Sequence, residues 1–425
     1  MNDEHPAREL GDAIAELLAH PDGLPARLTS RPWWRQSLAH GAPGIALLHI
    51  ERAAAGLSPW RRAHDWLAYA TQAPLTTGFD SHLFYGAPAV AHALACAADL
   101  LPGSYTGALD HLDRVIAADV RRRASSALGW LEAGHLPSLS EFDLVRGLTG
   151  IGSYLLRRAP GSEATRAVLE YLVRLTEPTR DGEESLPGWW TLSGPDGHEH
   201  DHFKGGHANS GLAHGIGGPL ALLALASRRD VVVDRHLDAI SRICTWLDRW
   251  RTDTPSGPIW PYWVNRPQQR ADQRSVSGSQ RPSWCYGTAG LARAQQLAAL
   301  ATGDTERRDM AERALMQALT DPAQRSSTTD PTLCHGYAGL AHIAARVAAD
   351  AAPDTAEGLH ALIPDLLDSI HTVSTDPGRT AVALLGDRGC GPAFLEGGAG
   401  IALAVLTPTG TGIPRSGWDT CLLVA

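Results

Sequence analysis

Arg281-Pro-Ser-Trp-Cys-Tyr-Gly-Thr-Ala-Gly290 is the stretch around which the sequence is organised. Leu333-Cys-His-Gly-Tyr-Ala-Gly-Leu340 repeats its layout 49 residues further on, so that a cysteine again precedes a Gly-x-x-Gly step. Cys285, Cys334 and His335 therefore occupy matching places in two copies of one structural unit. Two thiols and an imidazole, with room for a fourth ligand, are typical of a catalytic zinc site. The alternative is that both cysteines are small buried apolar residues.

The composition limits the classes of protein to which this chain can belong. The chain has 425 residues, of which 44% are apolar, so it can bury a sizeable core. Its net charge of −9 argues against a nucleic-acid-binding surface. It would suit a neutral or basic peptide partner, although net charge says little about individual sites.

The cysteine usage and the N-terminus indicate a cytoplasmic protein. Six cysteines lie far apart in a long chain, and the start, Met1-Asn-Asp-Glu-His-Pro6, lacks the apolar segment of a signal peptide. We therefore expect free or metal-binding thiols rather than disulfides. No apolar run reaches the ~18 residues that a membrane helix needs. The sequence predicts no stable membrane insertion, although a peripheral biosynthetic complex is compatible with it.

The fold can be predicted from an internal repeat. A Gly-x-x-Gly step followed by an Ala/Leu-rich run recurs seven times, with Ala89 as the second residue of one step. The first glycines of the steps are Gly41, Gly86, Gly147, Gly215, Gly287, Gly336 and Gly397. The runs are apolar on all sides, as buried helices are, and an amphipathic helix precedes each step. We expect an all-α fold in which seven inner and seven outer helices form a double ring, in one domain spanning residues 1–425.

The helix boundaries and insertions can also be predicted. The amphipathic helices are expected at Arg8–Ala19, Trp60–Thr71, Ala108–Glu132 (one helix or two), Glu163–Leu175, Val232–Trp250, Thr305–Leu319 and Thr355–His371. Two long segments, Asp181–Ser210 and Arg251–Ser283, interrupt the rhythm and are expected to be loop insertions near the site, with or without short strands. Trp260 and Trp263 predict a peptide-binding surface on the second segment; the alternative is that they pack it against the helices.

The residue before each first glycine is polar or aromatic in every repeat. These residues are His40, Tyr85, Arg146, His214, Tyr286, His335 and Glu396. Equivalent positions of a closed ring lie at one level, so these side chains are expected to line one end of the fold. Function is more readily assigned to such a site than to the fold itself.

Several motifs resemble the lanthionine synthetase C-like family. They are Gly211-Leu-Ala-His-Gly-Ile-Gly-Gly218, Trp284-Cys-Tyr-Gly287, Cys334-His-Gly336, Phe142-Asp-Leu-Val-Arg-Gly-Leu-Thr-Gly150 and Trp418-Asp419. The resemblance extends over essentially the whole chain. It implies an α/α toroid and a zinc-dependent lanthipeptide (lantibiotic) cyclase, which closes thioether rings in a dehydrated precursor peptide. It also implies a stand-alone cyclase whose peptide is dehydrated by a separate dehydratase.

The resemblance carries over to individual residues. It implies that Cys285, Cys334 and His335 bind Zn²⁺, and it places Asp143, His214, Arg281 and Tyr286 around the metal. In these roles His214 is a general acid/base and Asp143 orients its ring. Arg281 and Tyr286 bind the substrate carbonyl as enolate charge develops. The structural alternatives are a hydrogen-bonded histidine, a helix-capping aspartate, a loop cation and a packed tyrosine.

Two other functions remain open at this stage. A zinc-thiolate alkylating enzyme of the protein prenyltransferase type would share the α/α toroid, but no diphosphate-binding cluster of basic residues is evident. A non-catalytic relative that binds glutathione or a peptide belongs to a different class. Intact His214 and Asp143 count against that alternative without excluding it.

Overall fold

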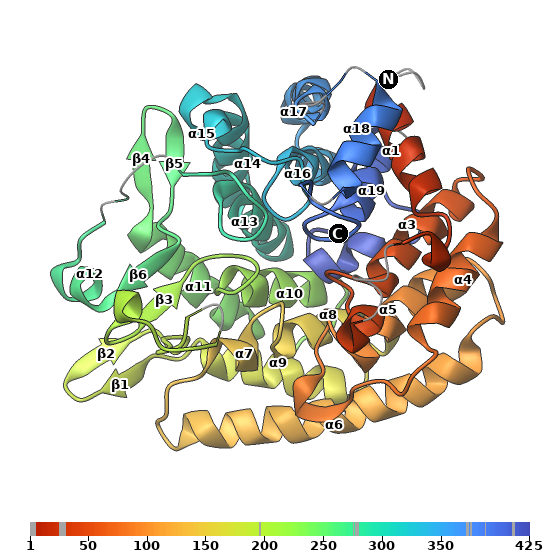
Figure 1. The fold of residues 1–425 in the computed structure, drawn as a ribbon. Coiled ribbons are helices and arrows are strands. Elements are labelled where there is room, and N and C mark those ends of the chain that lie inside the picture. Colours follow the sequence, from red (N-terminus) through yellow and green to blue (C-terminus); the bar gives the residue numbers. More distant parts are fainter. Residues whose placement is uncertain are drawn as a thin grey trace. The chain divides into compact units, whose positions relative to one another are not determined.

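The computed structural model describes residues 6–24, 31–194, 197–274, 276, 280–370, 374, 376–386, 388–409 and 413–425. Helices dominate it (Figure 1). The chain divides into two compact units. The first comprises Met1–Ile116, Thr328–Cys421 and Ala425, and the second comprises Ala117–Ser327 and Leu422–Val424. Helix α6 (Thr106–Glu132) contributes to both units and is one continuous helix.

Within the first unit, four repeats supply buried helices. These are α3 (Ala42–Ala54), α5 (Ala87–Ala98), α16 (Tyr337–Asp350) and α19 (Gly398–Thr409). They pack side by side in the order α16, α19, α3, α5. Amphipathic helices cover them: α4 (Trp60–Ala70) packs on α3, α17 (Pro353–Asp368) on α16, and α1 (Pro6–Leu17) with α18 (Pro377–Leu385) on α19. Helix α18 was not predicted from the sequence.

The second unit repeats this arrangement. Its buried helices are α8 (Leu148–Arg158), α10 (Gly217–Ser227) and α13 (Thr288–Thr302), with α10 packed between the other two. Helix α9 (Glu163–Leu175) covers α8, α11 (His236–Trp250) covers α10, and α14 (Thr305–Thr320) covers α13. Short helices α7 (Leu139–Phe142), α12 (Arg266–Ala271) and α15 (Pro322–Ser326) lie in the connections. Helix α11 starts four residues later than predicted.

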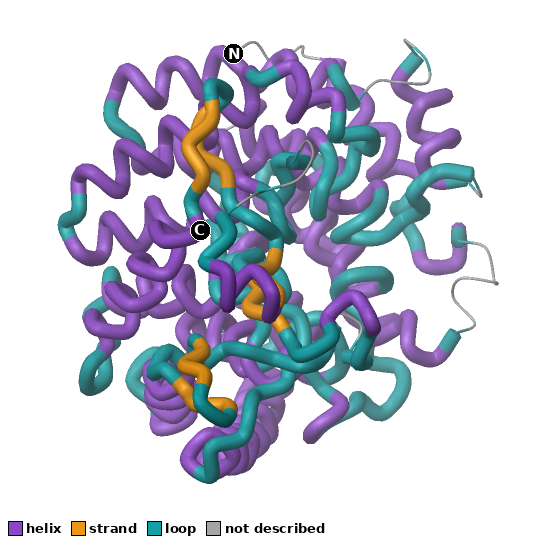
Figure 2. The backbone as a smooth tube through the Cα atoms, turned by 90° about the vertical axis from the view of Figure 1, so that its left-hand side faces the viewer, coloured by secondary structure: helices purple, strands orange, loops and turns teal. Residues whose placement is uncertain are grey.

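The two predicted insertions contain short antiparallel strands (Figure 2). Hairpins are formed by β1 (Thr179–Asp181) with β2 (Glu184–Leu186), and by β4 (Thr252–Thr254) with β5 (Gly257–Ile259). The third pair joins the insertions to each other, because β3 (His207–Asn209) pairs with β6 (Trp263–Asn265). The sequence was compatible with strands in both insertions, but it did not predict that β3 pairs with β6.

Trp260 takes the packing role rather than the recognition role. Its side chain is only 5% exposed, and its indole N–H donates to the Leu247 carbonyl of α11 over 3.0 Å. The prediction of a peptide-binding role is therefore wrong for Trp260. Trp263 is half-buried in β6 and lies edge-on to Tyr286, with ring centroids 6.3 Å apart.

Close backbone approach explains the second glycine of the steps. A Cβ atom on Gly290 would lie 2.0 Å from the carbonyl oxygen of Trp284, and one on Gly339 would lie 2.0 Å from that of Leu333. Any side chain would force the preceding loop away from the first turn of the buried helix. The glycines are therefore required where each loop folds back onto its helix.

Backbone hydrogen bonds connect these loops from one repeat to the next. In the first unit Cys334 N–H donates to Leu395 O (2.8 Å), and Leu395 N–H donates to Ala39 O (3.1 Å). In the second unit Leu144 N–H donates to Ala213 O, and Ala213 N–H donates to Cys285 O, both over 3.1 Å. Equivalent positions thus lie at one level within each unit, as the repeat register predicted.

The Trp418-Asp419 motif has a structural role in the first unit. Asp419 is fully buried and accepts hydrogen bonds from His342 (2.9 Å) and from both Nε and Nη2 of Arg346 (2.6 and 2.9 Å). Burial alone would raise the pKa of this carboxyl, but Arg346 and His342 hold it well below its usual range. The motif therefore fastens the C-terminal segment to α16.

Candidate active site

Asp143 and His214 form a hydrogen-bonded pair in the second unit. Oδ2 of Asp143 accepts from Nδ1 of His214 over 2.6 Å, and Asp143 is only 1% exposed. Its other oxygen, Oδ1, accepts from the backbone N–H groups of Arg146 (2.6 Å) and Gly147 (2.8 Å). One carboxylate therefore both fixes the loop that leads into α8 and orients the imidazole. With the proton held on Nδ1, the other ring nitrogen of His214 is a proton acceptor.

Tyr286 lies against His214. Their rings are nearly parallel, with an interplanar angle of 29° and centroids 6.0 Å apart. Tyr262, from the second insertion, lies on Tyr286 with centroids 5.9 Å apart. Two phenols and an imidazole therefore gather at the end of the second unit where the loops precede α10 and α13.

Arg281 is held through its backbone by Tyr262. The Arg281 N–H donates to the phenol oxygen over 2.9 Å, and the phenol O–H donates back to the Arg281 carbonyl over 3.3 Å. Burial raises the pKa of Tyr262, so this phenol stays protonated and can keep donating. The half-buried Arg281 guanidinium enters no ion pair with any described residue. It remains a cation that can meet an external anionic group.

Ser283 supports the loop that carries Cys285. Its hydroxyl oxygen accepts from the backbone N–H groups of Tyr286 (3.3 Å) and Gly287 (3.0 Å), and the thiol of Cys285 lies 3.5 Å from it. Ser283 stands four residues before its glycine, as Asp143 does. Ser283 was not predicted from the sequence, although its place four residues before Gly287 matches that of Asp143 before Gly147.

In the first unit, His335 lies between two carboxylates. Its Nε2 is 3.4 Å from Oδ2 of Asp330, and its Nδ1 is 4.0 Å from Oε1 of Glu396. Asp330 is itself fixed, since its Oδ1 accepts from the backbone N–H of Thr332 over 2.9 Å. Metal-binding histidines commonly donate their second N–H to a carboxylate in this way. The neighbouring Cys334 is 8% exposed.

The six cysteines form no disulfide, as predicted. Burial raises the pKa of Cys244 and of Cys390 to about 11, so both thiols are protonated at neutral pH. Neither belongs to the predicted zinc set.

Comparison with known proteins identifies the class. Residues 32–423 match the family described as lanthionine synthetase C-like protein, and the chain belongs to this family. The nisin biosynthesis protein NisC of Lactococcus lactis subsp. lactis is 25% identical over 320 residues, which cover 72% of each chain. The solved structure of a nisin cyclase superposes with a TM-score of 0.75 at 22% identity, covering 97% of this chain and 96% of that one.

These findings confirm the predicted family and the predicted α/α toroid fold. As for the membrane, none of the described helices combines the length and the apolar character that crossing a bilayer requires. The cytoplasmic location inferred from the sequence stays a prediction.

Proposed function

We propose that the protein is a lanthipeptide cyclase. It would add cysteine thiols to dehydroalanine or dehydrobutyrine in a dehydrated precursor peptide and so form lanthionine or methyllanthionine rings. The observation that carries the proposal is the Asp143–His214 hydrogen bond, in a chain that matches the lanthionine synthetase C-like family over residues 32–423. The name of its similar relative, nisin cyclase, supports the same reaction.

The proposed cofactor is Zn²⁺, bound by Cys285, Cys334 and His335. All three precede the first glycine of a repeat by one or two residues, Cys285 in the second unit and Cys334 and His335 in the first. Two thiolates and an imidazole are ligands that zinc prefers, and a catalytic zinc keeps its fourth position open. When bound there, zinc would lower the pKa of a peptide thiol from its ordinary ~8.5. Asp330 or Glu396 would fix the orientation of the His335 ring.

His214 is the proposed proton carrier. Asp143 holds a proton on Nδ1, so Nε2 can accept the proton that the peptide thiol gives up. Sulfur then bonds to the β-carbon, the carbon–carbon double bond becomes an enolate, and His214 returns the proton to the α-carbon. The reaction therefore leaves the mass of the peptide unchanged and consumes one thiol for each ring.

Arg281 and Tyr286 are the proposed enolate-binding groups. The guanidinium of Arg281 can donate to the carbonyl oxygen on which negative charge develops. The position of Tyr286 against His214 would bring its phenol to the same reacting group. Tyr262 would act indirectly, by fixing the backbone of Arg281.

The biological setting follows from this chemistry. A cyclase of this kind requires an enzyme that dehydrates serine and threonine in the precursor peptide, which we propose is a separate dehydratase. We further propose that the protein acts in the cytoplasm as a single functional domain, with or without a peripheral complex at the membrane.

A mass-spectrometric thiol assay tests the proposal. The zinc-loaded protein is incubated with a dehydrated, cysteine-containing precursor peptide, and remaining thiols are alkylated before the mass is measured. A cyclase yields peptide of unchanged mass that takes up no alkylating reagent, at a rate well above that with the His214→Asn variant. A non-catalytic peptide-binding protein would leave the thiols available, and a prenyltransferase-type enzyme would increase the peptide mass with an added diphosphate substrate. Either result would overturn the proposal.

A further inference from the structure

Ser283 has a hydrogen-bonding capacity that its own loop does not use up. Its side chain is 1% exposed and so lies away from bulk water. Its hydroxyl oxygen accepts from the backbone N–H groups of Tyr286 and Gly287, over 3.3 and 3.0 Å. A hydroxyl has two acceptor positions and one proton to donate. The loop therefore occupies both acceptor positions and leaves the O–H proton available.

The sulfur of Cys285 is the acceptor that this proton can reach. Sγ lies 3.5 Å from the Ser283 hydroxyl oxygen, and among the described residues the hydroxyl has no partner besides this sulfur and the two loop N–H groups. A protonated thiol could itself donate to the oxygen. A thiolate has no proton, so the contact then runs only from the hydroxyl to the sulfur.

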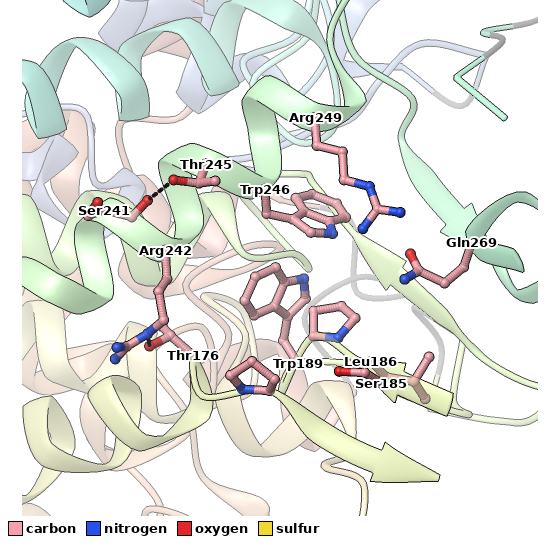
Figure 3. Close-up of a pocket in the computed structure, with 12 residues that line it drawn as sticks. Thr176, Ser185, Leu186, Trp189, Ser241, Arg242, Thr245, Trp246, Arg249 and Gln269 are labelled. Carbon is pink, nitrogen blue, oxygen red and sulfur yellow. Dashed lines mark hydrogen bonds between the residues drawn. The ribbon is translucent and has the colours of Figure 1, made fainter. Parts of the chain in front are cut away.

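Another buried hydroxyl of the second unit shows the same division of roles. Thr176, which is 2% exposed, accepts from Nε of Arg242 over 3.0 Å (Figure 3) and donates to the Val173 carbonyl over 2.7 Å. Buried hydroxyls normally find a partner for their proton in this way. At Ser283 the sulfur of Cys285 takes the place that the Val173 carbonyl has at Thr176.

The repeat register sets Ser283 beside two instructive counterparts. Asp143 stands four residues before its glycine as well, and it fixes its loop through Oδ1 while Oδ2 reaches His214. Ser37, in the same register before Gly41, accepts from the N–H of His40 over 3.1 Å and has no thiol among its described hydrogen-bond partners. This position therefore supports the loop in all three repeats and contacts a proposed site residue in two of them.

We infer that Ser283 is a positioning residue for the proposed zinc ligand Cys285, because its hydroxyl donates to the thiolate of that ligand. The inference rests on the proposed function, which makes Cys285 a ligand. A neutral donor stabilises a buried thiolate without adding a second charge, and it holds the sulfur in one direction. Hydrogen-bond partners of metal ligands commonly change the metal affinity by about 10–100-fold when they are removed.

The zinc affinity of three Ser283 variants tests the inference. The dissociation constant is measured on the full chain by competition with a chromophoric chelator, and thermal unfolding of each metal-free sample reports the state of the fold. Ser283→Ala should weaken zinc binding about tenfold or more. Ser283→Thr keeps the hydroxyl and should restore the affinity. Ser283→Asp can accept the loop N–H groups, as Asp143 does, but a carboxylate cannot donate to a thiolate, so zinc binding should weaken although the loop is supported.

Ser37→Ala is the matched control. It removes a loop acceptor in the same register without touching a thiol, so it should bind zinc as the wild type does. A second readout uses Co²⁺ in place of zinc. The sulfur-to-cobalt charge-transfer band should shift in Ser283→Ala and Ser283→Asp and stay in place in Ser37→Ala, because a hydrogen bond to the sulfur changes its donor strength.

Three results would overturn the inference. They are wild-type zinc affinity in both Ser283→Ala and Ser283→Asp, an equal loss of affinity in Ser37→Ala, and a full chain that takes up no zinc at all. The last result would also contradict the proposed metal site. Zinc binding that depends on Ser283 in a protein that closes no rings would support the inference and contradict only the proposed activity.

Discussion

Replacing Asp143 by asparagine is expected to slow ring closure by about 10²–10⁴-fold while the fold survives. The two oxygens of Asp143 have separate partners, so one substitution can affect them differently. The side-chain oxygen of asparagine can still accept from the N–H groups of Arg146 and Gly147, which Oδ1 accepts at 2.6 and 2.8 Å. The amide NH₂ would then face Nδ1 of His214, where Oδ2 now accepts over 2.6 Å.

The size of the effect follows from the tautomer. An amide donor opposite Nδ1 favours the imidazole with its proton on Nε2, which can no longer accept the thiol proton. Stability should change by only about 1 kcal/mol, the usual net contribution of one hydrogen bond. The assay measures thiol loss against time in the dehydrated peptide, with thermal unfolding of the same sample.

Asp143→Ser is the matched control, because Ser283 occupies the equivalent place and its hydroxyl oxygen accepts from the Gly287 N–H over 3.0 Å. It should preserve the hydrogen bonds of the loop while leaving His214 without an acceptor, so activity falls and the melting temperature stays close to that of the wild type. If the asparagine variant closes rings at the wild-type rate, the Asp143–His214 contact has no catalytic role. If both variants unfold, Asp143 is mainly structural.

Three further predictions concern other residues. His214→Asn should keep its zinc yet lose about 10²-fold or more in ring closure, measured by metal analysis and thiol assay; loss of the metal would make His214 a ligand instead. Trp260→Ala should destabilise the fold by about 3–5 kcal/mol and leave peptide affinity unchanged. Trp263→Ala, at a half-buried position, should instead weaken peptide binding. If calorimetric titration shows the same loss of peptide affinity for both variants, this assignment is wrong. Burial lowers the pKa of His49 from its ordinary 6.5 to about 4. Between pH 6.5 and pH 4 this histidine is therefore protonated in the unfolded chain and neutral in the folded chain. The free energy of unfolding should fall by about 3 kcal/mol over this range as the pH is lowered. Urea unfolding of His49→Gln should show a shallower pH dependence, and an unchanged slope would refute that assignment.

The fold was predictable because a short-range rule repeats seven times. Each Gly-x-x-Gly step marks where a loop touches the first turn of a buried helix, since a Cβ atom on Gly290 or Gly339 would lie only 2.0 Å from a carbonyl oxygen of that loop. Helix α18 and the start of α11 were not predicted correctly, because no Gly-x-x-Gly step marks where these helices begin. The pairing of β3 with β6 escaped for a different reason: three-residue strands far apart in sequence leave no periodic pattern.

The candidate site was partly accessible from the sequence. The repeat register and the family motifs together pointed to His214 and Asp143, which lie in contact. The two contacts of Asp143 could not be foreseen, because helix capping and ring orientation were weighed as alternatives, whereas one oxygen holds the loop before α8 and the other holds the imidazole. Tyr262 was missed since it lies in an insertion with no counterpart in other repeats, and only the structure reveals its contact with Arg281. The metal-binding and catalytic roles themselves stay predictions.

X-ray absorption at the zinc edge tests the central claim most directly. The purified protein is predicted to contain one zinc with two sulfur neighbours at about 2.3 Å and a nitrogen at about 2.0 Å. Cys334→Ser should reduce the sulfur count to one. A zinc without sulfur neighbours, or full zinc retention in a protein that lacks both Cys285 and Cys334, would contradict the account.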